Sequence, residues 1–238
     1  MPFFFFDTTM VLLIPAFLLA MWAQMKVKSA YAKYAEIGNR RGLSGADVAQ
    51  LILRDAGIDM QASGNISGPA CSLECVPGNL TDHYDPTSKT LRLSEAVYHG
   101  RSIAAVGIAA HEVGHAIQHA RMYAPLGLRS VLYPISSFGS TLAWPLFFIG
   151  FFFRSGIFLQ AGIVLFTFAV LFTLITLPVE FNASKRALRA LTDGRYLEDE
   201  ELLGARKVLG AAAMTYVASA VMAITQLLRM VLLSNSRD

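Results

Sequence analysis

Residues 157–179 read IFLQAGIVLFTFAVLFTLITLPV and contain no charged side chain. A helix needs about 20 apolar residues to cross the hydrocarbon core of a bilayer, so this run predicts a transmembrane span. Residues 126–153, LGLRSVLYPISSFGSTLAWPLFFIGFFF, predict a second span, and only Arg154, Ser155 and Gly156 separate the two runs. So short a connection makes the two spans an antiparallel hairpin.

Two further runs, residues 3–24 and 208–228, are also long and apolar enough to span a membrane. Hydrophobic residues form 54% of the 238-residue chain and charged residues 16%, which excludes an ordinary soluble domain. A cleaved signal peptide is the alternative for the first run, but no basic residue precedes Phe3 and no small-residue cleavage site follows. We predict a mainly α integral membrane protein with about four transmembrane helices, forming a single domain over residues 1–238.

Basic side chains flank the predicted spans on one side. They follow the first span and lie between the third and fourth, at Lys26, Lys28, Lys33, Arg40, Arg41, Lys185, Arg186, Arg189, Arg195, Arg206 and Lys207. The positive-inside rule then places residues 25–125 and 180–207 in the cytosol of a multi-pass protein of the inner, cytoplasmic membrane. The net charge of +3 is accounted for by these flanks, so we expect a lipid bilayer as partner and no nucleic acid.

The first polar region carries several local structural signals. Ser44 and Asp47 have the spacing of a capping box that opens a short helix, which Gly57 would end. Residues 80–93 predict a small β-hairpin around an Asp-Pro turn, and residues 102–121 predict a helix. Cys71 and Cys75 alternate with polar residues as in a half-buried strand, so we interpret both as core cysteines and not as metal ligands.

The helix predicted over residues 102–121 contains the string His111-Glu-Val-Gly-His115. Residues four apart lie on one helical face, so His111 and His115 can present two imidazoles to one metal ion, with Glu112 beside them as a base for water. Gly114 would leave room beside the metal. The alternative interpretation is an amphipathic helix with two structural histidines.

A catalytic zinc takes three protein ligands and keeps one position open. His119 continues the spacing, but eight residues of helix separate its Cα from that of His111 by about 12 Å, too far for one ion. The predicted hairpin returns the chain to the side where the metal helix ended, and Glu180 follows directly, opening a new helix over residues 181–191. Glu180 is therefore the predicted third ligand; the alternative is an interfacial carboxylate paired with Lys185 or Arg186.

Several strings resemble a known family. They are Leu80-Thr-Asp-His-Tyr-Asp-Pro, the segment from Arg101 through His111-Glu-Val-Gly-His115-Ala-Ile-Gln, Tyr123-Ala-Pro-Leu, and Pro178-Val-Glu-Phe-Asn-Ala-Ser. The chain resembles the bacterial family of small neutral zinc metallopeptidases of the membrane and, more distantly, the heat-shock membrane protease HtpX and the CAAX prenyl endopeptidases. In those distant relatives the Glu of a Glu-aromatic-x-Ala-Asp string is the third zinc ligand, which the resemblance carries onto Glu180, Phe181 and Ala183. Ser184 stands where they have Asp.

These observations predict a zinc-dependent endopeptidase that hydrolyses peptide bonds of protein or peptide substrates on the cytosolic face, with one zinc per chain. Its cytosolic part would be a helical, zincin-like domain with a small β-hairpin, which either offers an edge strand to substrate or serves packing alone. Candidates for substrate or oxyanion contacts are His83, Tyr84, His99 and Arg186. The alternatives are a non-catalytic zinc-binding scaffold or regulator, and a transporter or channel, which should carry ionisable groups in mid-span. Substrate identity and oligomeric state stay open.

Overall fold

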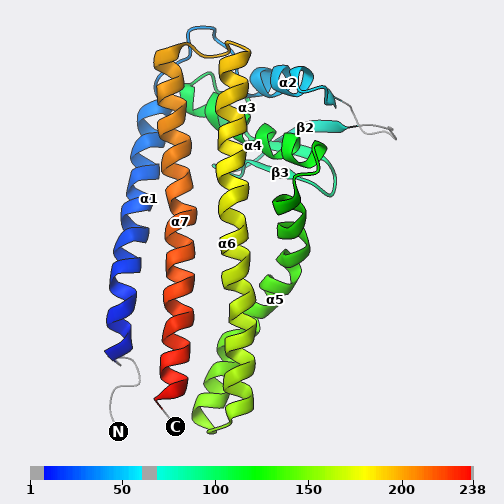
Figure 1. Ribbon diagram of the computed structural model, residues 1–238. Helices are drawn as coiled ribbons and strands as arrows, with labels where there is room; N and C mark the ends of the chain where they lie inside the picture. The colour runs from blue at the N-terminus through cyan, green and yellow to red at the C-terminus, as the bar shows by residue number, and fades with distance from the viewer. Residues whose placement is uncertain (1–7, 61–68, 237–238) are drawn as a thin grey trace. The chain divides into compact units, whose positions relative to one another are not determined.

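The computed structural model describes residues 8–60 and 69–236, and it is mostly helical (Figure 1). The helices are the short 3-10 helix η1 (Thr8–Leu12), α1 (Leu13–Ala35), α2 (Gly45–Asp55), α3 (Glu95–Tyr98), α4 (Ile103–Ala120), α5 (Ala124–Phe152), α6 (Gly156–Asp193) and α7 (Asp199–Asn235). The strands are β1 (Asp59–Met60), β2 (Ala70–Val76), β3 (His83–Asp85) and β4 (Thr90–Ser94).

Contacts divide the chain into two compact units, which we describe separately. The helical unit comprises residues 1–25, 127–178 and 214–238, and the α/β unit comprises residues 26–126 and 179–213. Among the described residues, four helices are long and apolar enough to cross a membrane, at residues 9–35, 124–152, 156–193 and 199–235. The four predicted spans therefore correspond to helices of sufficient length, although residues 3–7 of the first lie outside the described residues. α1, α6 and α7 extend past the C-terminal ends of their predicted apolar runs, whereas α5 ends at Phe152.

One predicted boundary is wrong. A new helix was expected after Pro178, but α6 runs without interruption from Gly156 to Asp193 with Pro178 inside it. Proline removes one backbone hydrogen bond from a helix, and this loss is tolerated in long apolar helices, where neighbouring groups satisfy the freed carbonyl. Likewise, α5 continues through Pro134 and Pro145. Glu180 therefore lies on the same helix as the third apolar run.

The helical unit is held together by close packing of α5 against α6, whose hairpin lies at the bottom of Figure 1. A Cβ added at Gly162 would lie 2.7 Å from the carbonyl oxygen of Ala143, so glycine permits this approach of the two backbones. Phe147 and Phe166 fill a buried cluster beside this contact. Membrane helices commonly associate in this way, through small residues that let backbones meet.

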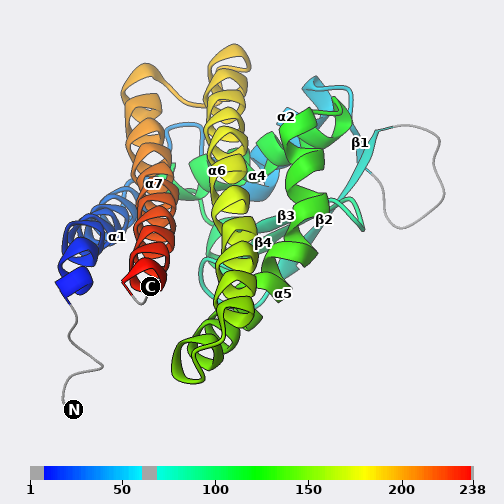
Figure 2. The same cartoon turned by 60° about the horizontal axis from the view of Figure 1, so that its bottom comes forward.

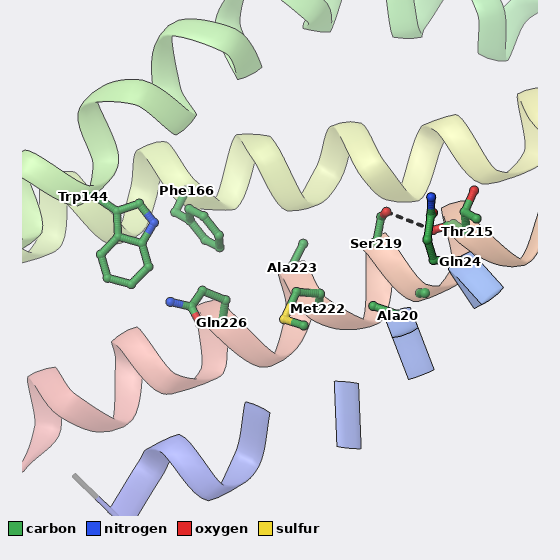
Figure 3. Close-up of a pocket in the computed structure, with 10 residues that line it drawn as sticks. Ala20, Gln24, Trp144, Phe166, Thr215, Ser219, Met222, Ala223 and Gln226 are labelled. Carbon is green, nitrogen blue, oxygen red and sulfur yellow. Dashed lines mark hydrogen bonds between the residues drawn. The ribbon is translucent and has the colours of Figure 1, made fainter. Parts of the chain in front are cut away.

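A cavity of about 490 Å³ opens in the helical unit between residues of α1, α5, α6 and α7 (Figure 3). Trp144 and Phe166 form one end, and α7 contributes alanines together with Ser219 and Gln226. The hydroxyl of Ser219 donates to the backbone oxygen of Thr215 at 2.9 Å, so its proton is used within the helix.

The α/β unit contains a four-stranded sheet in the order β1-β2-β4-β3 (Figure 2). β2 is parallel to β1 and β4, and β3 pairs antiparallel with β4 in the register Tyr84 to Leu91. The predicted hairpin over residues 80–93 is thus confirmed, with β3 and β4 as its strands. Helix α4 contacts β3 and β4 and also packs against α2.

The two predicted helices of this unit are confirmed, and so is the predicted capping box of the first. The side chain of Ser44 accepts from the backbone of Asp47, and Asp47 accepts from the backbone of Ser44, forming the capping box of α2. Ser102 caps α4 by accepting from Ala105 N at 3.1 Å. Apolar residues of both helices and of β4 share one core, which contains Val48, Ile52, Leu91, Leu93, Val106, Ala110 and Val113.

The two cysteines lie in different surroundings. Cys71 is buried as predicted, but Cys75 is exposed, which corrects the interpretation of both as core residues. Ala70 and Cys71 pair with β1, and Ser72 to Val76 pair with β4, so each part of β2 has a paired strand on one side. Cys71 packs into the core of the unit near the beginning of the strand, whereas Cys75 near its end does not, although both fit the alternating pattern.

We expect iodoacetamide to modify one cysteine quickly in the native, detergent-solubilised protein at pH 8 and two after denaturation. Cys75 is exposed, whereas burial raises the pKa of the Cys71 thiol to about 11, so its reactive thiolate is scarce at this pH. Intact-mass spectrometry counts the adducts. Cys75→Ser should abolish the fast reaction, and two fast adducts in the wild type would show that Cys71 is accessible.

Candidate metal centre

Helix α4 brings the two histidines of the motif together on one face. Ser102 fixes the start of the helix, and most of the residues between it and His111 are buried. The rings of His111 and His115 meet edge to face, with centroids 4.9 Å apart. Both Nε2 atoms face the same carboxylate oxygen, Oε2 of Glu180, at 3.2 Å from His111 and 3.6 Å from His115.

Glu180 reaches the histidines because α6 approaches α4 very closely. A Cβ added at Gly114 would lie 2.5 Å from the backbone oxygen of Ala183, so a side chain at this position would hold the two helices apart. The room that Gly114 provides is therefore room for the backbone of α6, and not room beside a metal as the sequence suggested. Glu180 lies one helical turn before Ala183 and is only 2% exposed.

The three side chains fit a zinc ion. Their ligand atoms all lie within 4.8 Å of one another. Four ligands at about 2.0–2.1 Å from a tetrahedral zinc lie about 3.3 Å apart, and the distances of 3.2 and 3.6 Å between imidazoles and carboxylate bracket that value. Two imidazole nitrogens and one carboxylate oxygen are also a donor set that zinc accepts in catalytic sites.

The electrostatics of the cluster favour a positive charge. Burial disfavours a charged imidazole at His115, but the hydrogen bond to Glu180 and the charges of Glu112 and Glu180 outweigh it, so the pKa of His115 is raised. Two carboxylates therefore attract a cation to this position. Either a proton or a metal ion satisfies that attraction, and the two compete for the same nitrogen.

A glutamine fixes the orientation of His115. The side-chain nitrogen of Gln118 donates to the backbone oxygen of Val179 at 2.8 Å and to Oδ1 of Asn182 at 3.0 Å. Its Oε1 is therefore the acceptor that faces Nδ1 of His115 at 3.0 Å, so that this nitrogen carries the ring proton. The other nitrogen, Nε2, either carries a second proton that it shares with Glu180 or, once deprotonated, has a lone pair available for a metal ion.

A serine has the corresponding place beside His111. Oγ of Ser184 lies 3.1 Å from Nδ1 of His111, so the residue that departs from the Asp of the distant relatives still contacts a histidine of the cluster. A hydroxyl can accept the ring proton as a carboxylate would, but without its negative charge.

Sequence reasoning missed Gln118, Asn182 and the packing role of Gly114. A signal for Gln118 was present, because it follows His115 by three residues and therefore lies on the same helical side. No local pattern connects Asn182 or Ala183 to the motif, since they belong to a helix far along the chain.

The other predicted site residues are not members of the cluster and have contacts of their own. His83 is exposed and its Nδ1 lies 2.8 Å from the backbone oxygen of Thr81, while the ring of His99 packs edge to face on Tyr98. The remaining candidate, Arg186, donates to Oδ1 of Asn182 at 2.7 Å. Because Asn182 also accepts from Gln118, Arg186 is linked to His115 through two side chains.

Tyr84, His119 and Glu112 complete the site region. Tyr84 places its hydroxyl 2.8 Å from Nδ1 of His119, which is therefore engaged with the β-hairpin, and His119 is not a member of the cluster. Glu112 is half-buried and follows His111 directly on α4.

Comparison with known proteins supports this reading of the site. A family model described as "Putative neutral zinc metallopeptidase" matches residues 9–235. The chain belongs to this family. It is also 46% identical over 228 residues to "Putative membrane protease YugP" of Bacillus subtilis (strain 168), covering 95% of this chain and 97% of that relative. No solved structure matches. Membership in the zinc metallopeptidase family confirms the predicted resemblance, and the family implies zinc, for which the His-His-Glu cluster is a suitable site.

We expect Gly114→Ala to weaken zinc binding by tenfold or more, although all three cluster side chains remain. The new methyl group meets the backbone of α6 and must move it, at a cost of about 1–3 kcal/mol. Zinc per chain, measured by mass spectrometry after dialysis against a graded chelator series, tests this.

Gly107→Ala is the matched control, because it makes the same change on the same helix. Its Cβ would meet its nearest neighbour, the Cβ of Ala205, at an ordinary 3.4 Å, so zinc binding should be unchanged. Wild-type zinc affinity in Gly114→Ala would show that the helix approach does not control the site.

Proposed function

We propose that this protein is a zinc-dependent endopeptidase of the membrane, with one zinc per chain held by His111, His115 and Glu180. The observation that carries the proposal is the convergence of both Nε2 atoms on one oxygen of Glu180, with Glu112 adjacent on α4. A bound zinc would supply Lewis acidity, which polarises the scissile carbonyl and makes water a better nucleophile at neutral pH.

The remaining steps belong to residues of the chain. The carboxylate of Glu112 accepts a proton from the attacking water as the oxygen bonds to the carbonyl carbon. When the carbon–nitrogen bond breaks, Glu112 returns that proton to the leaving amine, so the glutamate is unchanged at the end of the cycle. Gln118 and Ser184 hold the imidazole rings in orientation throughout.

The presence of Glu112 favours an enzyme over a non-catalytic zinc-binding scaffold or regulator. A scaffold needs the three ligands only, whereas a carboxylate next to the ligand face is what water activation requires. His83, Tyr84, His99 and Arg186 stay candidates for oxyanion or substrate contacts. Two of them are connected to α4 by hydrogen bonds. Tyr84 bonds directly to His119. Arg186 is connected to Gln118 through Asn182.

We further propose that the α/β unit faces the cytosol of a multi-pass inner-membrane protein, and that its substrates include membrane proteins. Support comes from the basic residues that flank the apolar helices and from the similarity to a relative named as a membrane protease. The two units would then act together as one membrane metallopeptidase domain.

We expect Glu112→Gln to keep its zinc and lose casein hydrolysis by at least a hundredfold, because it removes the base and no ligand. Glu180→Ala should lose zinc and hydrolysis together, because it removes one of three ligands. Zinc content and hydrolysis are measured on the same detergent-purified samples.

His119→Ala is the control for ligand loss, because His119 bonds to Tyr84 and lies outside the cluster. It should retain its zinc. Full zinc in Glu180→Ala with depletion in His119→Ala would overturn the ligand assignment, and wild-type hydrolysis in Glu112→Gln would overturn the enzyme.

The proposed orientation predicts that a membrane-impermeant maleimide leaves Cys75 unlabelled in sealed, right-side-out vesicles and labels it after permeabilisation. Cys75 is exposed in the α/β unit, so only the bilayer would protect it. The control is Ser155→Cys in a Cys75→Ser background, at the predicted external hairpin tip, which should label in sealed vesicles. The reverse pattern would invert the topology.

A further inference from the structure

A cavity of about 220 Å³ lies in the α/β unit between α4 and the sheet. Its α4 wall consists of Ala116, His119 and Ala120, and the opposite wall includes Cys71 of β2 and Tyr84 of β3. The small alanine side chains leave this space between helix and sheet, which larger residues at the same positions would fill.

The cavity continues the side of α4 that carries Glu112. On a helix, Ala116 lies one turn after Glu112, and His119 and Ala120 lie two turns after it on the same side. The α6 contact at Gly114 and Gln118 lies on the opposite side of the metal ligands. The space therefore begins about 5 Å along the helix from the catalytic base, which is one helical turn.

An extended peptide places side chains on one side at intervals of about 6.5 Å, close to one helical turn. A substrate with its scissile carbonyl beside Glu112 would therefore direct the side chain of a residue flanking that bond toward this cavity. A whole small-molecule ligand occupies about 300–1,000 Å³, so a cavity of 220 Å³ suits a single side chain.

The walls select for an apolar side chain. Ile58, Ala116 and Ala120 are apolar, and the hydroxyl of Tyr84 is already hydrogen-bonded to His119. Burial raises the pKa of Tyr84 and Cys71 and lowers that of His119, so these three groups are uncharged at neutral pH. Among the described residues that line the cavity, the remaining charged group is Lys89, whose ammonium disfavours a cationic side chain.

From these observations we infer that the cavity between α4 and the sheet is a specificity subsite, which receives one apolar side chain, of leucine to phenylalanine size, next to the scissile bond. The inference rests on the proposed peptidase function. It names Ala116 and Ala120 as specificity-determining residues, because their small size creates the space.

The test compares wild type with Ala120→Leu, which places a larger side chain in the cavity at a half-buried position near the end of α4. Both proteins digest a proteome-derived peptide library, and mass spectrometry reads the residues around each cleaved bond, with Glu112→Gln as the blank. Wild type should favour Leu, Met and Phe over Lys and Arg at one flanking position. In Ala120→Leu this preference over Gly and Ala should fall about tenfold, with zinc content and the other positions unchanged.

Ala96→Leu is the matched control, since Ala96 is exposed on α3 and does not line the cavity. It should cleave with wild-type preference. Ala116→Val, which narrows the cavity from a second position, should change the same flanking position as Ala120→Leu. An unchanged preference in both cavity variants with zinc retained, or a wild-type preference for basic residues, would overturn the subsite.

A second test measures the selectivity of the subsite in a variant that should not hydrolyse peptides. Calorimetry compares the binding of leucine hydroxamate and glycine hydroxamate to zinc-loaded Glu112→Gln. The leucine compound should bind about tenfold more tightly, and adding Ala120→Leu should remove that difference. If this selectivity holds while no peptide is hydrolysed by wild type, the peptidase function fails and the apolar subsite stands. If hydrolysis depends on Glu112 but neither readout responds to Ala120→Leu, the subsite fails alone.

Discussion

The burial of the Glu180 carboxylate between two imidazoles constrains most of what surrounds it. A buried carboxylate costs several kcal/mol unless opposite charge and hydrogen bonds compensate it. Here the compensation comes from His111 and His115 on another helix, with Nε2 atoms 3.2 and 3.6 Å away. That requires α4 and α6 to meet at backbone distance, which the missing Cβ of Gly114 allows. The close packing of α4 on α6 and the geometry of the metal centre therefore both depend on Gly114.

One backbone acceptor sets the orientation of the Gln118 side chain and, through it, that of His115. The backbone oxygen of Val179 can only accept, so it determines which end of the Gln118 amide faces His115, and the amide determines where the ring proton lies. The hydroxyl of Ser184 contacts the corresponding nitrogen, Nδ1, of His111. The result is two imidazoles whose Nε2 atoms face one carboxylate, an arrangement suited to a cation and unsuited to an anion.

The two sides of helix α4 differ in how closely they are packed. Toward α6 the contacts are close and polar groups are paired, which gives the ligands a fixed geometry. Toward the sheet, Ala116 and Ala120 leave open space beyond Glu112, and Tyr84 with His119 forms part of its wall. The hairpin, proposed from sequence either as an edge strand or as packing, provides packing through Tyr84 and also leaves β3 at the edge of the sheet. Hydrogen-bonded ligands beside an open cavity suit the proposed enzyme, which must hold a metal and admit a side chain.

The sequence by itself determined the elements whose signals are local. Apolar runs determined four long helices, the Ser44 cap determined where α2 begins, and the spacing of His111 and His115 placed two imidazoles on one face. Glu180 could also be predicted, because a hairpin of two apolar runs must return the chain toward its origin, and the structure brings it to the histidines. Tertiary structure alone decided the rest. Continuation of α6 through Pro178, exposure of Cys75, and the contacts of Gln118, Asn182 and Ser184 depend on which backbone or strand lies opposite. Such partners are distant in the chain, and no periodicity or spacing within one segment carries information about them.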